Sequence, residues 1–309
     1  MQTLLHLSPE VEEALHGNRP IVALESTLIT FGLRWPANAE TALAMESAIR
    51  ASGAVPATIG VLAGQVIVGL SPDEIEYFAQ RPSGSVRKCS VRDLPIVVGR
   101  REDGATTVAS TAVIAHKAGL KVFATGGIGG VHRDAPYDVS ADLIELGRTP
   151  IAVVCAGAKA ILDLPLTLEV LETQGVPVVG LGTDTLPGFY SRSSGLPIDV
   201  RVETPREAAA IIAASRRLEA QHAVLIVVPI PEEKEFGGAE TAISQAASEA
   251  ARLGIHGKQV TPFMLRRVSE LTEGASQVAN TALLINSARV AGLIAKELCT
   301  MAAASMQTI

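Results

Sequence analysis

Lys159 is the residue whose type and position point most directly to chemistry. It follows the apolar run Ile151–Cys155 and three small residues at positions 156–158, and a helical spacing of apolar residues begins at Ile161. Side chains at the carboxyl end of a strand that leads into a helix commonly build the sites of α/β proteins. An unprotonated lysine amine in such a place is a nucleophile toward carbonyl carbons. For this segment alone, the alternative is a lysine that extends from a strand end into water.

Glu25 and His132 are the candidates for moving protons. Glu25 ends a second apolar run, Ile21–Leu24. A carboxyl group partly removed from water at a strand end is suited to general acid–base work, although a solvated loop residue would have the same sequence. His132 is a candidate donor or, as is commoner for a lone histidine, a core residue with a satisfied ring.

Two segments are candidates for binding an anion. The glycine-rich stretch 121–132 runs from a strand into a turn, but His132 stands where the dinucleotide pattern needs glycine, so the glycines predict either ligand approach or a tight turn. At 104–111, the hydroxyls of Thr106 and Thr107 stand at a predicted helix start and indicate a phosphate seat or ordinary N-caps. Lys88 is a candidate point charge for the phosphate, or an exposed lysine.

Asp138 and Asp142 are the candidate metal ligands. They are four residues apart and share one face if a helix has already begun at Asp138. Oxygen donors without a nearby histidine pair favour Mg²⁺ or Mn²⁺ held by few protein groups and several waters. The alternative is that Asp138 or Ser140 caps the helix and Asp142 interacts with its dipole.

Strand-like and helix-like segments alternate along the chain, and this pattern must position these side chains. The predicted strands are 21–24, 58–62, 66–69, 94–98, 122–125, 151–155, 176–181, 198–202 and 223–228. The predicted helices are 38–51, 107–118, 142–146, 160–173, 205–218, 241–253 and 279–298. Residues 63–65 predict a hairpin, so we expect an α/β fold with a three-layer α/β/α sandwich around a mixed, mainly parallel sheet. Because no linker or repeat interrupts it, we expect one domain over residues 1–309.

The composition excludes several classes of function. The chain has 309 residues, a net charge of −6 and only 3% aromatic residues, without a basic run, so nucleic acid is not an expected partner. The three cysteines are far apart, which argues against zinc and disulfides and for a reducing cytoplasm. The start of the chain lacks a secretory pattern, and we expect neither export nor a membrane span. The largely helical final third is able to cover either its own sheet or a neighbouring subunit.

Several segments taken together resemble the pseudouridine-5′-phosphate glycosidase family, which includes the indigoidine synthase A-like proteins. The matching segments are 23–27, 104–111, 124–133, 138–143 and 153–164, continuing through 229–232, 261–263 and Asn280. The resemblance implies reversible cleavage of the carbon–carbon glycosidic bond of pseudouridine 5′-phosphate to uracil and ribose 5-phosphate. It also implies one manganese ion (Mn²⁺) per subunit, held mostly by water, and a homotrimer.

The resemblance assigns roles to individual positions. Lys159 matches the nucleophile, Glu25 the proton donor and Asp138 the metal ligand. The matches to substrate contacts are Lys88, Val108, Ser140, Ala141 and Asp142, with Thr107, His132 and Asn280 also at pocket positions. One departure is Val228, where the family often has asparagine before Pro-Ile-Pro.

The bond to be broken explains the need for a lysine. A carbon–carbon glycosidic bond has no leaving oxygen to protonate, so the carboxylate pair used on ordinary glycosides is insufficient. An imine between Lys159 and C1′ of the opened ribose supplies an electron sink for a retro-aldol-like step. Two alternatives remain: an imine-forming lyase or C-glycoside synthase for another sugar phosphate, and a sugar-phosphate-binding protein without catalysis.

Overall fold

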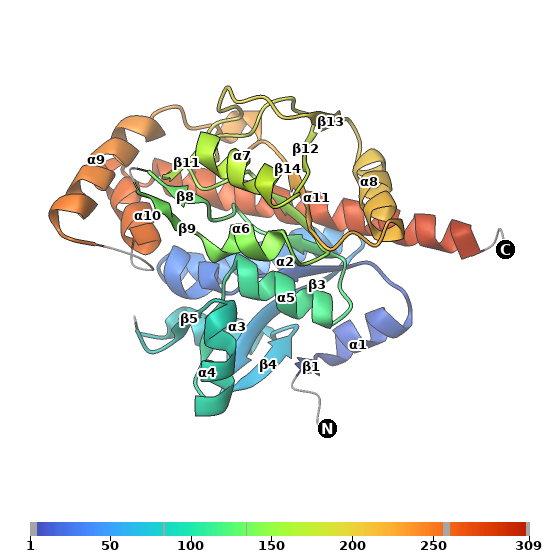
Figure 1. Ribbon diagram of the computed structural model, residues 1–309. Helices are drawn as coiled ribbons and strands as arrows, with labels where there is room; N and C mark the ends of the chain where they lie inside the picture. Colours follow the sequence, from blue (N-terminus) through green and yellow to red (C-terminus); the bar gives the residue numbers. More distant parts are fainter. Residues whose placement is uncertain (1–4, 83, 134, 256–259, 307–309) are drawn as a thin grey trace.

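The chain forms the expected three-layer α/β/α sandwich (Figure 1). The computed structural model describes residues 5–82, 84–133, 135–255 and 260–306. Within these residues the central sheet has eleven strands. They are β1 (Leu5–Leu7), β2 (Ile21–Leu24), β3 (Val55–Leu62), β4 (Gln65–Val68), β5 (Arg87–Cys89), β6 (Gly104–Thr106), β7 (Val122–Ala124), β10 (Ala152–Cys155), β12 (Val178–Leu181), β13 (Val200–Val202) and β14 (Val224–Val227).

The sheet is mixed and mainly parallel, as predicted. Its main path runs β1-β4-β3-β2-β7-β10-β14-β12-β13, with β6 joined to β3 and β5 joined to β6. The pairs β3–β4 and β3–β6 are antiparallel, and the other pairs are parallel. The predicted hairpin joins β3 to β4 through Ala63 and Gly64, whose φ angles are 48° and 80°. Such positive φ angles suit a tight hairpin turn, and glycine adopts them without strain.

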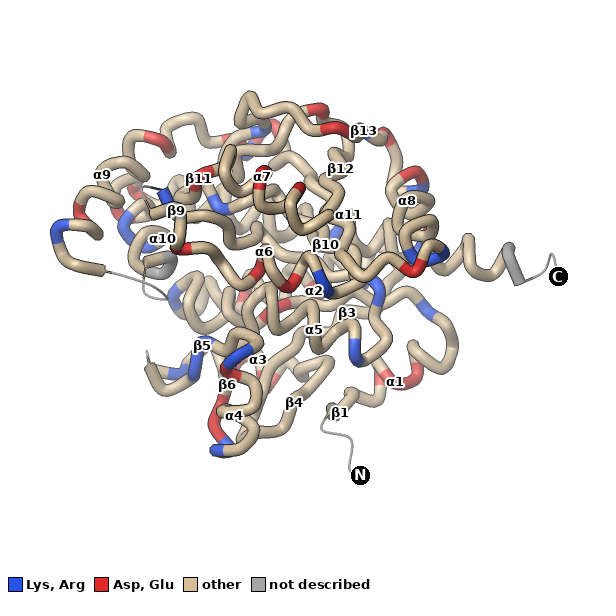
Figure 2. Tube along the Cα trace, in the orientation of Figure 1, with Lys and Arg blue, Asp and Glu red and all other residues tan. Residues whose placement is uncertain are grey.

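Helices cover both faces of the sheet. The helices are α1 (Pro9–His16), α2 (Ala37–Ala51), α3 (Pro72–Gln80), α4 (Leu94–Arg100), α5 (Val108–Lys117), α6 (Ala141–Leu146), α7 (Leu164–Thr173), α8 (Pro205–Arg217), α9 (Ala239–Arg252), α10 (Val260–Leu271) and α11 (Ala275–Met306). Shorter helical turns are η1 (Leu28–Gly32), η2 (Val91–Asp93) and η3 (Glu232–Lys234). One layer contains α11 packed on α2 and α8, and the other contains α5, α6 and α7 (Figure 1). Figure 2 shows Lys, Arg, Asp and Glu mostly on the outer helices and loops, as a buried sheet requires.

The long helix α11 is apolar because it lies in the core. Its residues 275–304 form the one helix in the described ranges that is long and apolar enough to span a membrane. In its most apolar window, 56% of the residues are buried inside the protein, where α11 packs on β2, β7 and β10. A helix that is apolar on all sides is typical of such a buried position.

Three of the segments interpreted from the sequence differ in the structure. Residues 94–98 form helix α4 and not a strand, because η2 and Pro95 in the first turn start a helix that a short apolar run does not reveal. The helix predicted from residue 160 begins at Leu164, since Leu162–Asp163 form a short strand, β11. Asp138 lies in a strand, β9 (Ala135–Val139), and α6 starts only at Ala141, so Asp138 and Asp142 do not share a helix face.

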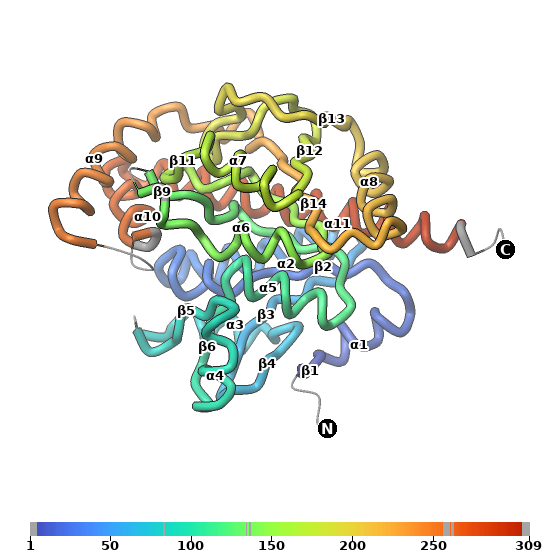
Figure 3. Tube along the Cα trace, in the orientation of Figure 1, coloured from blue at the N-terminus to red at the C-terminus, as the bar shows by residue number. Residues whose placement is uncertain are grey.

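A small second sheet was not predicted. It pairs β11 with β8 (Val131–His132) and β8 with β9, all antiparallel. Its strands are too short to give an alternating pattern in the sequence. Figure 3 places β9 and β11 at the same end of the molecule as α9 and α10. The second sheet carries two predicted site residues, His132 and Asp138.

Candidate active site

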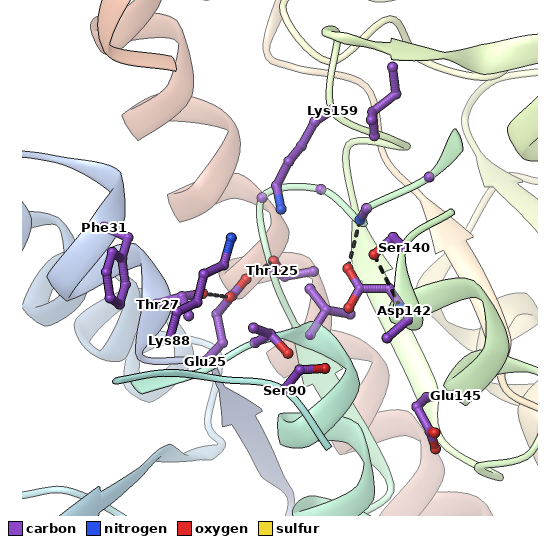
Figure 4. A pocket seen from close by; sticks show the side chains of 18 of the residues that line it. Glu25, Thr27, Phe31, Lys88, Ser90, Thr125, Ser140, Asp142, Glu145 and Lys159 are labelled. Atoms are coloured by element: carbon purple, nitrogen blue, oxygen red, sulfur yellow. Dashed lines mark hydrogen bonds between the residues drawn. The ribbon is translucent and has the colours of Figure 1, made fainter. Parts of the chain in front are cut away.

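A cavity of about 720 Å³ opens at the carboxyl ends of β2 and β7 and beside the loop that follows β10 (Figure 4). This edge of a parallel sheet is the usual place for a ligand. All of the predicted site residues line the cavity: Glu25, Lys88, Thr107, Val108, His132, Asp138, Ser140, Ala141, Asp142, Lys159 and Asn280. They come from segments spread over most of the chain, so the fold brings the predicted set together.

Glu25 is buried and held at both carboxylate oxygens. Its residue is only 6% exposed, directly after β2. The Thr125 hydroxyl donates to Oε1 at 2.5 Å, and the Thr27 hydroxyl donates to Oε2 (Figure 4). Thr125 follows β7 as Glu25 follows its neighbour β2. The carboxylate therefore has a fixed orientation toward the cavity.

Lys159 is positioned by two loops that lie side by side. The loop after β10 places Gly157 at a φ of 88°, a conformation that favours glycine. The N–H of Lys159 donates to the Ile128 carbonyl at 3.1 Å, and the N–H of Ile128 donates to the Gly157 carbonyl at 3.1 Å. Figure 4 shows the Lys159 amine directed into the cavity.

Asp142 joins the glycine-rich loop to helix α5. It is 6% exposed, and its two oxygens accept the N–H groups of Ala109 at 2.9 Å and Gly129 at 2.8 Å. A Cβ at Gly129 would lie 2.2 Å from Ser140 Oγ and 2.7 Å from Asp142 Oδ2, so only glycine fits there. Ser140 caps α6 by accepting the N–H of Asp142 at 3.2 Å. The Asp142 carboxylate thus holds the backbone of the glycine-rich loop against the start of α5 beside the cavity.

The start of α5 is capped from within the protein. Thr107 and Ser110 form a capping box, and Asp142 takes the N–H of Ala109. Thr106 is fully buried and its hydroxyl donates to the Ile59 carbonyl at 2.7 Å, so its predicted part in a phosphate seat is wrong. The capping interpretation of Thr107 is confirmed, while Val108, the first residue of α5, faces the cavity.

Charged groups surround His132 in the cavity. Burial lowers the pKa of the His132 ring below its ordinary value; the negative charge of Asp138 raises it, and the positive charges of Lys88 and Lys159 lower it further. Lys88 lies on β5, and its backbone pairs with β6 at Ala105. The cavity therefore combines two amines with several carboxylates.

The donor set around Asp138 fits an ion that keeps most of its waters. Among the residues that the structure describes, no three His, Cys, Asp or Glu side chains gather into a metal-binding group. Asp138 is exposed on β9 and lines the cavity, so it presents one hard oxygen donor with space for water. Mg²⁺ and Mn²⁺ accept this kind of coordination.

Several cavity residues were missed from the sequence. Thr27 and Thr125 hold Glu25, and Phe31 and Phe189 add apolar surface. Thr125 could have been predicted as a cavity residue from the sequence, because it follows an apolar strand as Glu25 does. Val228 is 7% exposed and absent from the cavity lining, and its N–H donates to the Cys155 carbonyl at 2.8 Å.

Comparison with known proteins finds relatives that match nearly the whole chain. The model of the family "Indigoidine synthase A like protein" matches residues 10–297. The chain is 51% identical to a pseudouridine-5′-phosphate glycosidase of Clostridium botulinum, over 96% of this chain and 98% of that protein. It is also 51% identical to a pseudouridine-5′-phosphate glycosidase of Paracoccus denitrificans, over 97% and 100% of the two chains.

Solved structures share the whole fold. The prealnumycin C-glycosynthase AlnA, in complex with ribulose 5-phosphate, superposes with a TM-score of 0.89 at 40% identity, covering 98% of this chain and 100% of that one. An indigoidine synthase A-like protein from Thermotoga maritima has a TM-score of 0.87 at 34% identity, with 96% of each chain covered. On the family match and these identities, the chain belongs to the indigoidine synthase A-like family.

Proposed function

We propose that this protein is an enzyme that reversibly cleaves pseudouridine 5′-phosphate to uracil and ribose 5-phosphate. The observation that carries the proposal is the meeting of Lys159, Glu25 and Lys88 in one cavity of about 720 Å³. The cavity lies within the usual size range of small-molecule sites. Relatives that are 51% identical over nearly the whole chain carry the name of this activity.

In the proposed cleavage, Lys159 is the nucleophile. Its Nζ bonds to C1′ of the ribose while the bond from C1′ to the ring oxygen breaks, and Glu25 gives that oxygen a proton. The nitrogen next gives a proton to the Glu25 carboxylate, and its lone pair then forms the C=N bond as the bond from C1′ to uracil C5 breaks; Glu25 now holds the proton that C5 needs. The electron pair of that bond stays on C5, which takes a proton to give uracil.

Water completes the cycle. It hydrolyses the imine, releases ribose 5-phosphate and restores the amine of Lys159, so one water is consumed per bond cleaved. In the reverse direction the imine carbon accepts the electron pair of uracil C5. We expect the substrate to be bound by Lys88 and by the start of α5 at Val108. The same cavity is lined by Ser140, Ala141 and Asn280. Binding energy from these contacts then positions the reacting carbon.

The proposal includes one Mn²⁺ per subunit, a homotrimer and a cytoplasmic location. Asp138 would hold the ion, with water in most of its coordination sites. When bound, the ion supplies positive charge that orients and polarises sugar oxygens. Light scattering tests the trimer, and metal analysis of the protein purified without chelators tests the ion.

A C-glycoside synthase acting on another sugar phosphate is the second candidate. It is favoured by the likeness to AlnA, which is named a prealnumycin C-glycosynthase. Both candidates use the same amine and differ in the partner of the new carbon–carbon bond. Val228 does not separate them, because it does not line the cavity.

Turnover of pseudouridine 5′-phosphate tests the proposal directly. We expect stoichiometric uracil and ribose 5-phosphate by chromatography, and formation of pseudouridine 5′-phosphate from the two products. Lys159→Met should abolish both directions in a folded protein, and the exposed Lys117→Met is a control that should not. If Lys159 forms an imine with ribose 5-phosphate but uracil is neither released nor consumed, the second candidate replaces the first.

A further inference from the structure

Glu25 is held by two hydroxyl groups. The hydroxyls of Thr125 and Thr27 each donate to a different carboxylate oxygen, and the Thr125 bond measures 2.5 Å. Thr125 is 1% exposed, and it also contributes to the lining of the cavity. Both oxygens of the candidate acid are therefore fixed before a substrate binds.

Thr125 is itself rigid. Its N–H donates to the Val154 carbonyl at 3.0 Å, which extends the pairing of β7 with β10. Three residues later on the same loop, the Ile128 carbonyl accepts the N–H of Lys159 at 3.1 Å. One short loop therefore carries the partner of the candidate acid and the backbone partner of the candidate nucleophile.

A hydroxyl suits a group that gains and loses a proton. It donates to a carboxylate, and after rotation it accepts from a carboxylic acid. A lysine ammonium or a backbone N–H can only donate, whereas a threonine hydroxyl can also accept the proton of a carboxylic acid. Its branched Cβ also restricts χ1, which keeps the oxygen in one place through the cycle.

We propose that Thr125, assisted by Thr27, is a positioning residue that keeps the Glu25 carboxyl aimed at the substrate in both of its protonation states. The inference deepens the proposed function and rests on it for the identity of the substrate. Thr125 acts through Glu25 and takes no part in forming the bond to Lys159. A threonine with only a packing role would affect stability and leave the proton transfer unchanged.

Three substitutions test this inference. Thr125→Val keeps the shape and removes the hydroxyl, Thr125→Ser keeps the hydroxyl, and Thr41→Val is a matched control at a buried threonine on α2, outside the cavity. We expect Thr125→Val to lower kcat about 10- to 100-fold with KM within about two-fold, because a misdirected acid slows proton transfer but not binding. Thr125→Ser should recover most of kcat, and Thr41→Val should leave it unchanged.

Two further readouts separate positioning from packing. The pH profile of kcat should move in Thr125→Val and not in Thr41→Val. Crystal structures of the wild type and of Thr125→Val should show the Glu25 carboxylate rotated in the variant, a result that requires no substrate. Capture of ribose 5-phosphate on Lys159 by borohydride should persist in Thr125→Val.

The inference is overturned if Thr125→Val keeps the wild-type kcat and pH profile, if its Glu25 carboxylate has not moved, or if Thr125→Ser is as impaired as Thr125→Val. Failure of the proposed function has a different signature. In that case the wild type itself releases no uracil from pseudouridine 5′-phosphate, while the crystal comparison still decides whether Thr125 positions Glu25.

Discussion

Two regions that line the cavity are built differently. We call Glu25, Thr125 and Asp142, with the strand ends and helix starts that carry them, the cavity floor. The second region is the hairpin of β8 and β9, with Asp138 exposed and Tyr137 99% exposed. On the floor, both oxygens of Glu25 and both oxygens of Asp142 accept hydrogen bonds from the protein.

The difference indicates that the reacting groups are held in place by the floor, whereas the exposed hairpin binds groups that come and go. Groups that meet developing charge are most effective when they are ordered in advance. An ion held mostly by water needs space and an accessible oxygen. The floor therefore has the construction expected of reacting groups, and the hairpin has the construction expected of a region that exchanges metal or substrate. The predictions below test this division.

The largest effect is expected at the floor residue Glu25. Glu25→Gln keeps the shape and removes the acid, and it should lower kcat by about 10²- to 10⁴-fold, which is the usual range for general acid–base catalysis. Capture of ribose 5-phosphate on Lys159 should still be detectable by mass spectrometry. A Gln variant with near wild-type turnover would remove Glu25 from the mechanism.

Asp142→Asn should remove one of the two hydrogen bonds by which Asp142 holds the backbone of the cavity floor. The asparagine NH₂ would face one of the two N–H groups now bound by the carboxylate, and each buried donor left without a partner costs about 1–3 kcal/mol. We expect a lower free energy of unfolding in urea together with a loss of activity. Asp163→Asn is the control, because Asp163 caps α7 and asparagine caps equally well. Equal stability of the two variants would argue against the assigned role of Asp142.

Asp138→Asn should behave differently, because the residue is exposed on the hairpin. The free energy of unfolding should stay within about 0.5 kcal/mol of wild type, as for other exposed substitutions. Binding of Mn²⁺, measured by calorimetry, should weaken. If Asp138→Asn binds Mn²⁺ as tightly as wild type, the ion is held elsewhere.

The smallest effect is expected where the hairpin meets α9. Arg133 forms a forked pair with Glu240, at 2.6 and 3.2 Å, and its side chain is 32% exposed against 68% for Glu240. Such a partly exposed pair contributes about 0.2–1 kcal/mol. A double-mutant cycle with Arg133→Gln and Glu240→Gln should give a coupling energy in this range. A coupling well above it would make the hairpin a fixed part of the site.

The sequence predicted which candidate residues meet in one cavity better than it predicted the hydrogen bonds that hold them. Glu25 and Lys159 follow apolar strands, and the carboxyl ends of parallel strands meet at one edge, so their meeting follows from the alternation of elements. The hydrogen bonds that Thr125 donates to Glu25 and that Ala109 donates to Asp142 join residues far apart in the chain. A threonine or an aspartate gives no signal for such a partner until the loops are packed.

Short elements were the least predictable. The strands β8 and β11 have no period to detect, and the five-residue apolar run of α4 suits a strand as well as a helix. Helix α3 was missed although Ser71 and Glu74 form a capping box and Pro72 stands at the first helical position. That signal was present in the sequence and would have located the helix start.

Covalent capture of the sugar on Lys159 is the most direct measurement of the central claim. The wild-type protein is incubated with ribose 5-phosphate and borohydride and digested with a protease, and the masses of its peptides are measured by mass spectrometry. The account predicts a reduced ribose 5-phosphate adduct on Lys159 and on no other lysine, absent in Lys159→Met. A wild-type protein that turns over pseudouridine 5′-phosphate without any adduct at Lys159, or an unimpaired Lys159→Met, would contradict it.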